Sequence, residues 1–351
     1  MGSRIDRDWF NLYFNAVGTP LGEAELSASF SGAIGVASAS IACDQPKSVH
    51  RFIASSIVLR LRNSMNAQRW PIGVFTSIDA GLGVQMQVVR DLRIPTIQLH
   101  APAKATRTNE QAESFLRQLD QSGVELTCVF GGFAGESYAD IPTVARTVGL
   151  VPSATRAARL AEMKEIAAFA RQLGCSVVAL HLGFVPHEVQ SLEYRDVVAA
   201  TSDLCRHCRS LGQNLHLETG QESAAALLQF IGVVGADNLF VNFDPANMIL
   251  YGTGQPIEAL LQIGSLVHSV HCKDATWSAR PGIEWGREVP LGQGDVNVEK
   301  FLGALLQIGY DGPLTIEREI PQDPQRQKAE IAHAAGLLEN LRRQLLNTAS
   351  K

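Results

Sequence analysis

The chain has 351 residues, enough for one large domain with an added segment or for two small domains. Its formal net charge of -5 argues against nucleic acid as the main partner, because phosphate-binding proteins usually carry a basic face. No apolar run reaches the ~18 residues that span a bilayer, and six cysteines without a disulfide pattern suit a reducing compartment, so we expect a cytoplasmic protein without a membrane segment.

Residues 1–66 do not follow the pattern of the rest of the chain. They contain scattered apolar pieces and a stretch of small residues at 27–40. They lack the basic start, continuous apolar core and cleavage site of a secretory signal. We predict a disordered or loosely packed N-terminal extension ahead of one domain at 67–348. Because Met65 directly precedes the first predicted strand, it stays open whether residues 1–64 belong to the native protein.

From Trp70 onward, short apolar runs alternate with helical patterns. The segment 275–293 has no helical period and is predicted as a long loop. Eight strands that alternate with eight helices predict an α/β fold, the (β/α)8 TIM barrel. The predicted strands are 72–77, 96–100, 125–130, 177–182, 214–217, 239–243, 266–270 and 314–316, and the predicted helices are 84–92, 109–122, 155–173, 194–211, 222–233, 256–263, 297–308 and 324–346.

Each of the last four predicted strands runs into a residue that can bind a metal. In a TIM barrel the carboxyl ends of all strands meet at one mouth, so we expect these four side chains to converge. Alone, such an Asp is usually a helix cap and such a His a satisfied core residue, but four caps at consecutive strand ends are not expected. Carboxylate oxygens with one imidazole suit Mn²⁺, Mg²⁺ or Co²⁺. The four residues are Glu218, Asp244, His271 and Glu317.

The two glutamates come from different strands and can lie on opposite sides of a substrate. A metal held beside them can bind two oxygens of an α-hydroxyketone and polarise the carbonyl. One carboxylate can then remove a carbon-bound proton and the other can return a proton, through an enediolate. We therefore predict that Glu218 and Glu317 form the acid/base pair of an isomerase or epimerase.

Four sequence segments contain the predicted metal ligands: LETGQE at 217–222, NFDPAN at 242–247, HCKD at 271–274 and TIERE at 315–319. Together they resemble the sugar phosphate isomerase/epimerase family, within the xylose isomerase-like TIM barrels, over about residues 70–345. The stretches 291–296 and 309–313 look like the same family's link into the last strand. The resemblance implies a small carbohydrate substrate and a divalent metal, Mn²⁺ in preference to Mg²⁺, Co²⁺ or Zn²⁺, on Glu218, Asp244, His271 and Glu317.

Four further residues are predicted to contact the substrate. His181 ends the fourth strand, where the family often places a substrate-facing His, although a core role is also open. Lys273 follows His271 by two residues and so points to the same side of the strand. Asn247 stands where 3-epimerases of this group often have a His, a departure that argues against a free-ketohexose epimerase. Glu222 lies one helical turn after Glu218 and can instead cap the next helix.

Several alternatives stay open at this point. The same site can serve a lyase or dehydratase of 3-keto sugars or inososes, while a DNA-repair nuclease would need more metal-binding His and a basic groove. A non-enzymatic binding protein on a decayed barrel is disfavoured by the complete ligand set, and a homo-oligomer is possible. Gly292 and Gly294 fit either a phosphate loop or a turn. Cys205 and Cys208 fit either a metal or redox pair or two buried helix thiols.

Overall fold

A computed structural model describes residues 28–29, 38–39, 69–78 and 82–349. The contacts divide the chain into two compact units, Met1–Ala67 and Gln68–Lys351. In the first unit, Ala28–Ser29 (β1) pairs antiparallel with Ser38–Ala39 (β2). The rest of residues 1–66, which the sequence predicts to be disordered or loosely packed, lies outside the described residues. Whether residues 1–64 belong to the native protein is therefore not addressed by the structure.

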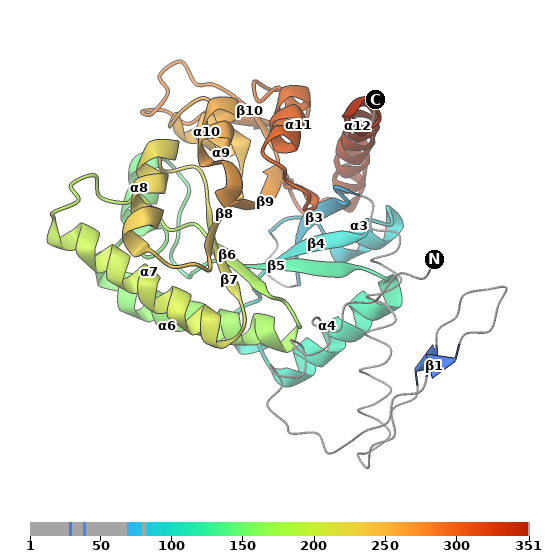
Figure 1. Cartoon of the computed structure of the whole chain (residues 1–351), viewed down its shortest axis with the longest axis horizontal. Coiled ribbons are helices and arrows are strands. Elements are labelled where there is room, and N and C mark those ends of the chain that lie inside the picture. Colours follow the sequence, from blue (N-terminus) through green and yellow to red (C-terminus); the bar gives the residue numbers. More distant parts are fainter. Residues whose placement is uncertain (1–27, 30–37, 40–68, 79–81, 350–351) are drawn as a thin grey trace, which may run out of the picture. The chain divides into compact units, whose positions relative to one another are not determined.

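In the second unit, eight parallel strands close into a barrel in the order β12-β3-β4-β5-β6-β7-β8-β9 (Figure 1). The ring closes where the last strand pairs with the first, with Leu314 opposite Ile72. This confirms the predicted TIM barrel. The strands are Ile72–Ser77 (β3), Thr96–His100 (β4), Glu125–Gly131 (β5), Val177–Leu180 (β6), Asn214–Glu218 (β7), Leu239–Phe243 (β8), Val267–Cys272 (β9) and Leu314–Ile316 (β12).

The helices that connect these strands cover the outside of the barrel, and α6 and α7 pack against each other there (Figure 1). Within the described part of the chain, no helix is both long and apolar enough to cross a membrane. All eight predicted helices are present, with ends shifted by a few residues. They are Met86–Asp91 (α3), Asn109–Ser122 (α4), Ser153–Gln172 (α6), Leu192–Ser210 (α7), Ala224–Val234 (α8), Pro256–Ile263 (α10), Val298–Gln307 (α11) and Pro324–Ala349 (α12).

Other short elements were not predicted from the sequence. The helix Pro245–Tyr251 (α9) is buried at every position, so it shows no alternation of polar and apolar faces. Ile141–Thr147 (α5) lies in a segment predicted as a loop. The predicted loop 275–293 carries the antiparallel hairpin formed by Asp274–Thr276 (β10) and Arg287–Val289 (β11). The structure also contains the single turns Lys104–Thr106 (η1) and Gly264–Leu266 (η2).

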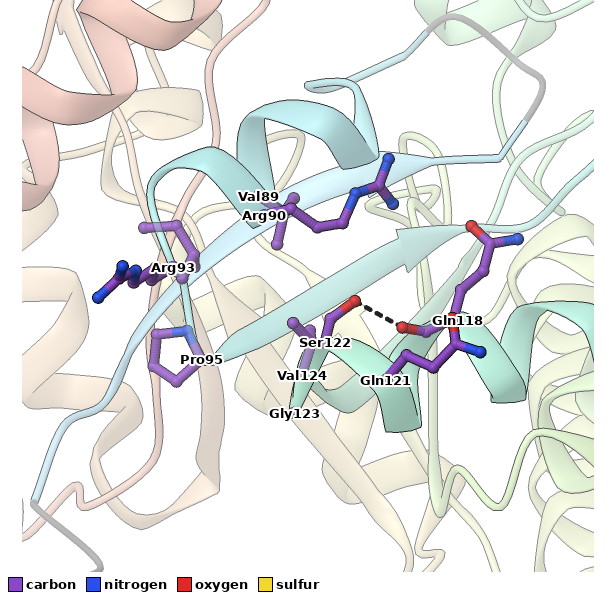
Figure 2. Close-up of a pocket in the computed structure, with 10 residues that line it drawn as sticks. Val89, Arg90, Arg93, Pro95, Gln118, Gln121, Ser122, Gly123 and Val124 are labelled. Carbon is purple, nitrogen blue, oxygen red and sulfur yellow. Dashed lines mark hydrogen bonds between the residues drawn. The ribbon is translucent and has the colours of Figure 1, made fainter.

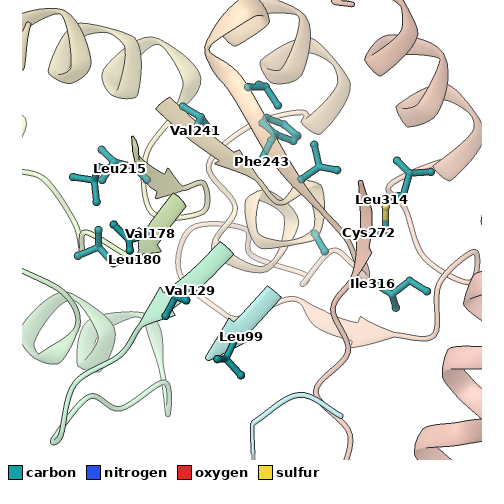
Figure 3. Close-up of a cluster of buried hydrophobic side chains, with 14 of the residues drawn as sticks. Leu99, Val129, Val178, Leu180, Leu215, Val241, Phe243, Cys272, Leu314 and Ile316 are labelled. Carbon is teal, nitrogen blue, oxygen red and sulfur yellow. The ribbon is translucent and has the colours of Figure 1, made fainter. Parts of the chain in front are cut away.

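The main hydrophobic core lies between the barrel and the helices. Side chains such as Leu99, Val129, Val178 and Val241 point outward from the ring of strands, away from the barrel axis (Figure 3). Each is fully buried. Because alternate residues of a strand face opposite sides, the residues between them are left to fill the barrel interior.

The barrel interior has an apolar side and a polar side. Phe75, Cys128, Phe130 and Ala179 form a separate buried cluster on β3 to β6. On β7 to β9 the interior positions are polar: His216 Nδ1 lies 2.8 Å from Ser269 Oγ, two strands away. His216 therefore lies inside the barrel, on the same side of β7 as Glu218, since residues two apart share one side of a strand.

The loop after β9 is tied down by one buried carboxylate. Asp274 Oδ2 accepts the backbone N–H groups of Gly292 and Gly294, both at 2.9 Å. Its Oδ1 accepts those of Ala275 and Val296 at 3.0 and 3.2 Å. A Cβ at Gly294 would lie 2.2 Å from Asp274 Oδ1, so the close approach requires glycine. This carboxylate closes the segment between β10 and α11 over the end of β9.

We expect Asp274→Ala to lower the free energy of unfolding by about 3 kcal/mol, because it leaves four N–H groups, two of them buried, without their acceptor. Urea unfolding measures the loss. Asp295→Ala is the matched control, since exposed Asp295 accepts a single N–H group, that of Trp277 at 3.0 Å. Equal losses in both variants would contradict the anchoring role of Asp274.

Candidate functional site

The structure brings the four predicted metal ligands together at the carboxyl ends of β7, β8, β9 and β12, four neighbouring strands of the barrel. Each residue offers one ligand atom, and these atoms all lie within 4.8 Å of one another. Glu218 ends β7, Asp244 directly follows β8, His271 lies in β9 and Glu317 follows β12. Glu218, Asp244 and His271 are buried, and Glu317 is partly exposed.

His271 lies at the centre of this cluster. Its Nδ1 is 2.8 Å from Glu218 Oε1, 3.1 Å from Glu317 Oε2 and 3.8 Å from Asp244 Oδ2. The ring contacts Phe75 and Phe130 on the apolar side of the barrel, with centroids 5.6 and 5.4 Å away. The two aromatic rings therefore support the face of an imidazole whose Nδ1 points at three carboxylates.

The two carboxylate oxygens of Asp244 have different surroundings. As the N-cap of α9, its Oδ1 accepts the backbone N–H groups of Ala246 and Asn247 at 2.8 and 3.1 Å. Its Oδ2 is buried and has no hydrogen-bond partner among the described residues. A buried carboxylate oxygen without a partner is costly. The donor set of three carboxylates and one imidazole therefore fits a divalent cation at Oδ2.

Glu218 is held by two predicted substrate residues. His181 Nε2 lies 2.8 Å from Glu218 Oε2, and Asn247 Nδ2 donates to Glu218 Oε1 at 3.1 Å. His181 is reached in turn by Gln221, whose Nε2 lies 3.3 Å from His181 Nδ1. Both His181 and Asn247 therefore border the site through a carboxylate, and their contact with a substrate stays a prediction.

Glu317 is held by the buried cation of Lys273. Lys273 Nζ donates to Glu317 Oε2 and to Glu319 Oε1, both at 3.3 Å, and lies 3.9 Å from Asp244 Oδ2. Glu319 itself is exposed. Lys273 thus lies beside the ligand cluster, as its two-residue spacing from His271 predicted.

The charges of these groups follow from their neighbours. Burial raises the pKa of Glu218, but His181 and His271 more than offset this and bring that pKa below its usual range. For Glu317, burial also raises the pKa, and Lys273 and His271 lower it well below the usual value. Both glutamates are therefore ionised at neutral pH.

The remaining groups shift in the opposite direction. Burial lowers the pKa of His271 and of Lys273, yet Glu317 and its neighbouring carboxylates raise both well above their usual values. Burial raises the pKa of Asp244 to about 6, although His271 and Lys273 lower it. In the absence of a metal, positive charge on His271 and Lys273 compensates the carboxylates.

Glu222 lies outside the cluster of four ligands. It is 8% exposed, and its Oε1 accepts the backbone N–H of Val185 at 2.7 Å. It thereby joins the loop after β6 to the loop after β7. The predicted contact of Glu222 with substrate stays a prediction, beside this structural contact.

The structure bears on two questions that the sequence left open: whether Gly292 and Gly294 form a phosphate loop, and whether Cys205 and Cys208 form a metal or redox pair. The N–H groups of Gly292 and Gly294 already donate to Asp274, which favours a turn over a phosphate loop. Cys205 and Cys208 are both buried in α7, and burial raises the pKa of each thiol to about 12. Thiols that stay protonated favour the interpretation as buried helix residues.

A surface cavity of about 600 Å³ lies at the other end of the barrel (Figure 2). It is formed by the segments that lead from α3 into β4 and from α4 into β5, with Arg90, Arg93 and Gln118 among its lining residues. None of the described residues that line it is a carboxylate, a histidine or a cysteine. The chemistry-bearing side chains lie at the opposite, carboxyl ends of the strands, so we assign this cavity no catalytic role.

Two glutamines that contact the site were not predicted from the sequence. Gln98 Oε1 lies 2.8 Å from His271 Nε2, across the interior from β4 to β9. Gln221 contacts His181 and donates to Tyr251 Oη at 3.0 Å. Gln98 lies two residues before His100, which ends β4. Residues two apart in a strand face the same side, and only this spacing could have indicated that Gln98 faces inward.

We expect Glu222→Gln to stabilise the protein at pH 8 and to leave its stability unchanged near pH 4. Burial raises the pKa of Glu222 to about 7, so the wild type has its full stability below the unfolded-state pKa and loses stability as pH rises through 7. Gln keeps an acceptor for Val185 without the charge. The gain should approach about 3 kcal/mol at most, measured by urea unfolding in EDTA.

Glu165→Gln, on the exposed face of α6, is the control for this pH series. It should show no difference from wild type that grows with pH. A Glu222→Gln variant that is less stable than wild type at pH 8 would show that the carboxylate is stabilised by groups other than Val185.

Comparison with known proteins agrees with the barrel fold. The family model described as xylose isomerase-like TIM barrel matches residues 83–341. A solved xylose isomerase domain protein from Planctomyces limnophilus is 57% identical, with 80% of this chain and 100% of that chain covered and a TM-score of 0.78. A search of curated proteins found no match.

More distant structures share the fold. A D-tagatose 3-epimerase-like protein is 16% identical, with 81% of this chain and 100% of that chain covered and a TM-score of 0.62. A probable 3-DHS dehydratase from Bacillus anthracis is 17% identical, with 70% and 90% covered and a TM-score of 0.52. With a family match over most of the barrel and a relative of 57% identity, the chain belongs to the xylose isomerase-like TIM barrel family.

Proposed function

We propose that this protein is a divalent-metal-dependent isomerase or epimerase that acts on a ketose, a polyol or a sugar phosphate. The observation that carries the proposal is the convergence of Glu218, Asp244, His271 and Glu317, with ligand atoms within 4.8 Å of one another. A shared fold with a D-tagatose 3-epimerase-like protein supports it. Mn²⁺ is the proposed metal, and Mg²⁺, Co²⁺ and Zn²⁺ are accepted by the same ligand types.

The two glutamates would move the proton. When bound, the metal polarises the substrate carbonyl and makes the neighbouring C–H more acidic. One glutamate takes that proton, and the bonding pair moves toward the carbonyl to give an enediolate. Because both glutamates start ionised, the other glutamate must first take a proton from water; it then delivers that proton to the opposite face for epimerisation, or to the adjacent carbon for isomerisation. The first glutamate afterwards gives its proton back to water, which restores both carboxylates. His181 and Asn247 orient Glu218 during this cycle, while Lys273 orients Glu317.

A lyase or dehydratase of 3-keto sugars or inososes is the second candidate. It is favoured by Asn247, which replaces the His of the 3-epimerases and donates to Glu218. It is also favoured by Lys273, a buried cation that can protonate a leaving oxygen as its C–O bond breaks. The similarity in fold to a probable 3-DHS dehydratase agrees with this alternative.

A small-molecule carbohydrate is the proposed binding partner for both candidate functions. The cytoplasmic location and any homo-oligomer stay predictions from the sequence.

We expect a divalent cation to stabilise the folded protein. At 100 times the dissociation constant, Mn²⁺ should raise the free energy of unfolding by about 2.7 kcal/mol, because it binds only the assembled site. Thermal unfolding with Mn²⁺, Mg²⁺, Co²⁺ or Zn²⁺ after EDTA treatment measures this. Asp244→Asn, which keeps the N-cap acceptor, should lose the response.

Asp203→Asn is the control for this metal series, because Asp203 pairs with Lys164 on the outer helices. It should keep the full response to Mn²⁺. If none of the four cations shifts the wild-type protein, the proposed metal site is wrong.

We expect Glu317→Gln and Glu218→Gln each to lower turnover by about 10²-fold or more, since each removes a proton-transfer group. The assay screens ketoses, their phosphates and 3-keto glycosides in D₂O, followed by mass spectrometry. Uptake of deuterium with no other change of mass identifies an isomerase or epimerase, and loss of water identifies a dehydratase. Glu165→Gln should retain activity, and an active Glu317→Gln variant would contradict the paired-glutamate mechanism.

A further inference from the structure

The two ring nitrogens of His271 face different surroundings. Nδ1 faces the ligand cluster, 2.8 Å from Glu218 Oε1 and 3.1 Å from Glu317 Oε2. Nε2 faces the barrel interior, 2.8 Å from Gln98 Oε1. Both His271 and Gln98 are 1% exposed, so water does not compete for this contact. The second nitrogen of the central histidine therefore has one protein partner, supplied by a strand on the other side of the barrel.

An amide oxygen can only accept a hydrogen bond. The contact from Gln98 Oε1 therefore requires a proton on Nε2 of His271. In a neutral imidazole this leaves the lone pair on Nδ1, the nitrogen that faces the three carboxylates. A metal-binding histidine needs this arrangement, because the hydrogen bond made by its other nitrogen fixes both the tautomer and the orientation of the ring.

The Gln98 amide also contacts a third interior residue. Gln98 Nε2 donates to Asn242 Oδ1 at 3.4 Å, and Asn242 is fully buried two residues before Asp244 on β8. An amide turned the other way would direct an N–H group at His271 Nε2 and would favour the proton on Nδ1. Asn242 and Gln98 thus form a chain across the interior that ends at His271.

We propose that Gln98 is a positioning residue that holds His271 with its proton on Nε2 and its lone pair directed to the metal. This rests on the proposed function, in which the cluster binds a divalent cation. Gln98 touches neither the cluster's carboxylates nor, by its place in the interior below His271, a substrate at the mouth. It acts through His271, and its effect is on metal affinity.

The test compares Gln98→Met, which keeps the shape but removes the amide, with Gln98→Glu, which keeps an acceptor for Nε2. The dissociation constant for Mn²⁺ is measured by electron paramagnetic resonance of the free ion. Loss of such a partner weakens metal binding by about 10- to 100-fold. We expect this loss in Gln98→Met and an affinity within about threefold of wild type in Gln98→Glu.

Gln213→Leu is the matched control for loss of a buried glutamine amide. Gln213 is 2% exposed and donates to the carbonyl oxygens of Ala167 and Cys175, both at 3.0 Å, just before β7 begins. It lies at the end of β7 opposite to Glu218. We expect Gln213→Leu to lower stability without changing the dissociation constant for Mn²⁺.

A second measurement does not depend on affinity. In Mg²⁺-loaded protein labelled with ¹⁵N-histidine, the Nε2 proton of His271 should exchange slowly in wild type and in Gln98→Glu. It should be lost to exchange in Gln98→Met, and His271→Asn identifies the signal. A purely structural role for Gln98 would lower stability without this difference between the two variants.

The outcomes separate the inference from the proposed function. If wild type binds Mn²⁺ and Gln98→Met binds it equally well, Gln98 does not position His271, and the metal-dependent function stands. If Gln98→Glu loses affinity as much as Gln98→Met does, the acceptor role is also wrong. If wild type binds none of the four cations, the proposed function fails and the inference fails with it.

Discussion

The site depends on the burial of three carboxylates in one small volume. Such a cluster is strongly unfavourable unless opposite charge is buried with it. Here His271 and Lys273 supply that charge, and their raised pKa values express it. A divalent cation would take over this compensation at the ligand atoms, most directly at Asp244 Oδ2, which has no hydrogen-bond partner among the described residues. The same side chains therefore serve both the stability of the barrel mouth and the proposed chemistry.

Side chains in the barrel interior support His271 in two ways. Phe75 and Phe130 pack against the ring of His271 from β3 and β5, and exclude water on that side. Gln98, on β4 between these two strands, accepts a hydrogen bond from His271 Nε2 and donates one to Asn242 on β8. An apolar interior would pack as well but would leave His271 Nε2 without an acceptor. The polar positions below the mouth are thus best understood as support for the ligands above them.

Around the mouth, two further carboxylates accept hydrogen bonds from backbone N–H groups. Asp274 collects the N–H groups that a glycine-rich loop offers, and Glu222 takes the one from Val185. Both carboxylates fix loops that follow barrel strands. The glycine pair therefore serves loop closure in this fold, and contact of the substrate with side chains at the mouth, such as His181 and Lys273, stays a prediction.

The sequence by itself determined the order and number of the barrel elements, and it predicted that Glu218, Asp244, His271 and Glu317 lie together, because strand ends in a parallel barrel must meet at one mouth. It also placed Lys273 near that mouth through alternation and His181 through its position at the end of a strand. Only the tertiary structure decided which groups face each other across the interior, such as Gln98 with His271 and His216 with Ser269. Those pairs join strands that are not neighbours, so they depend on the stagger of the closed ring. No local pattern records that stagger. The helix α9 was missed for a different reason, because burial at every position removes the alternation of polar and apolar faces.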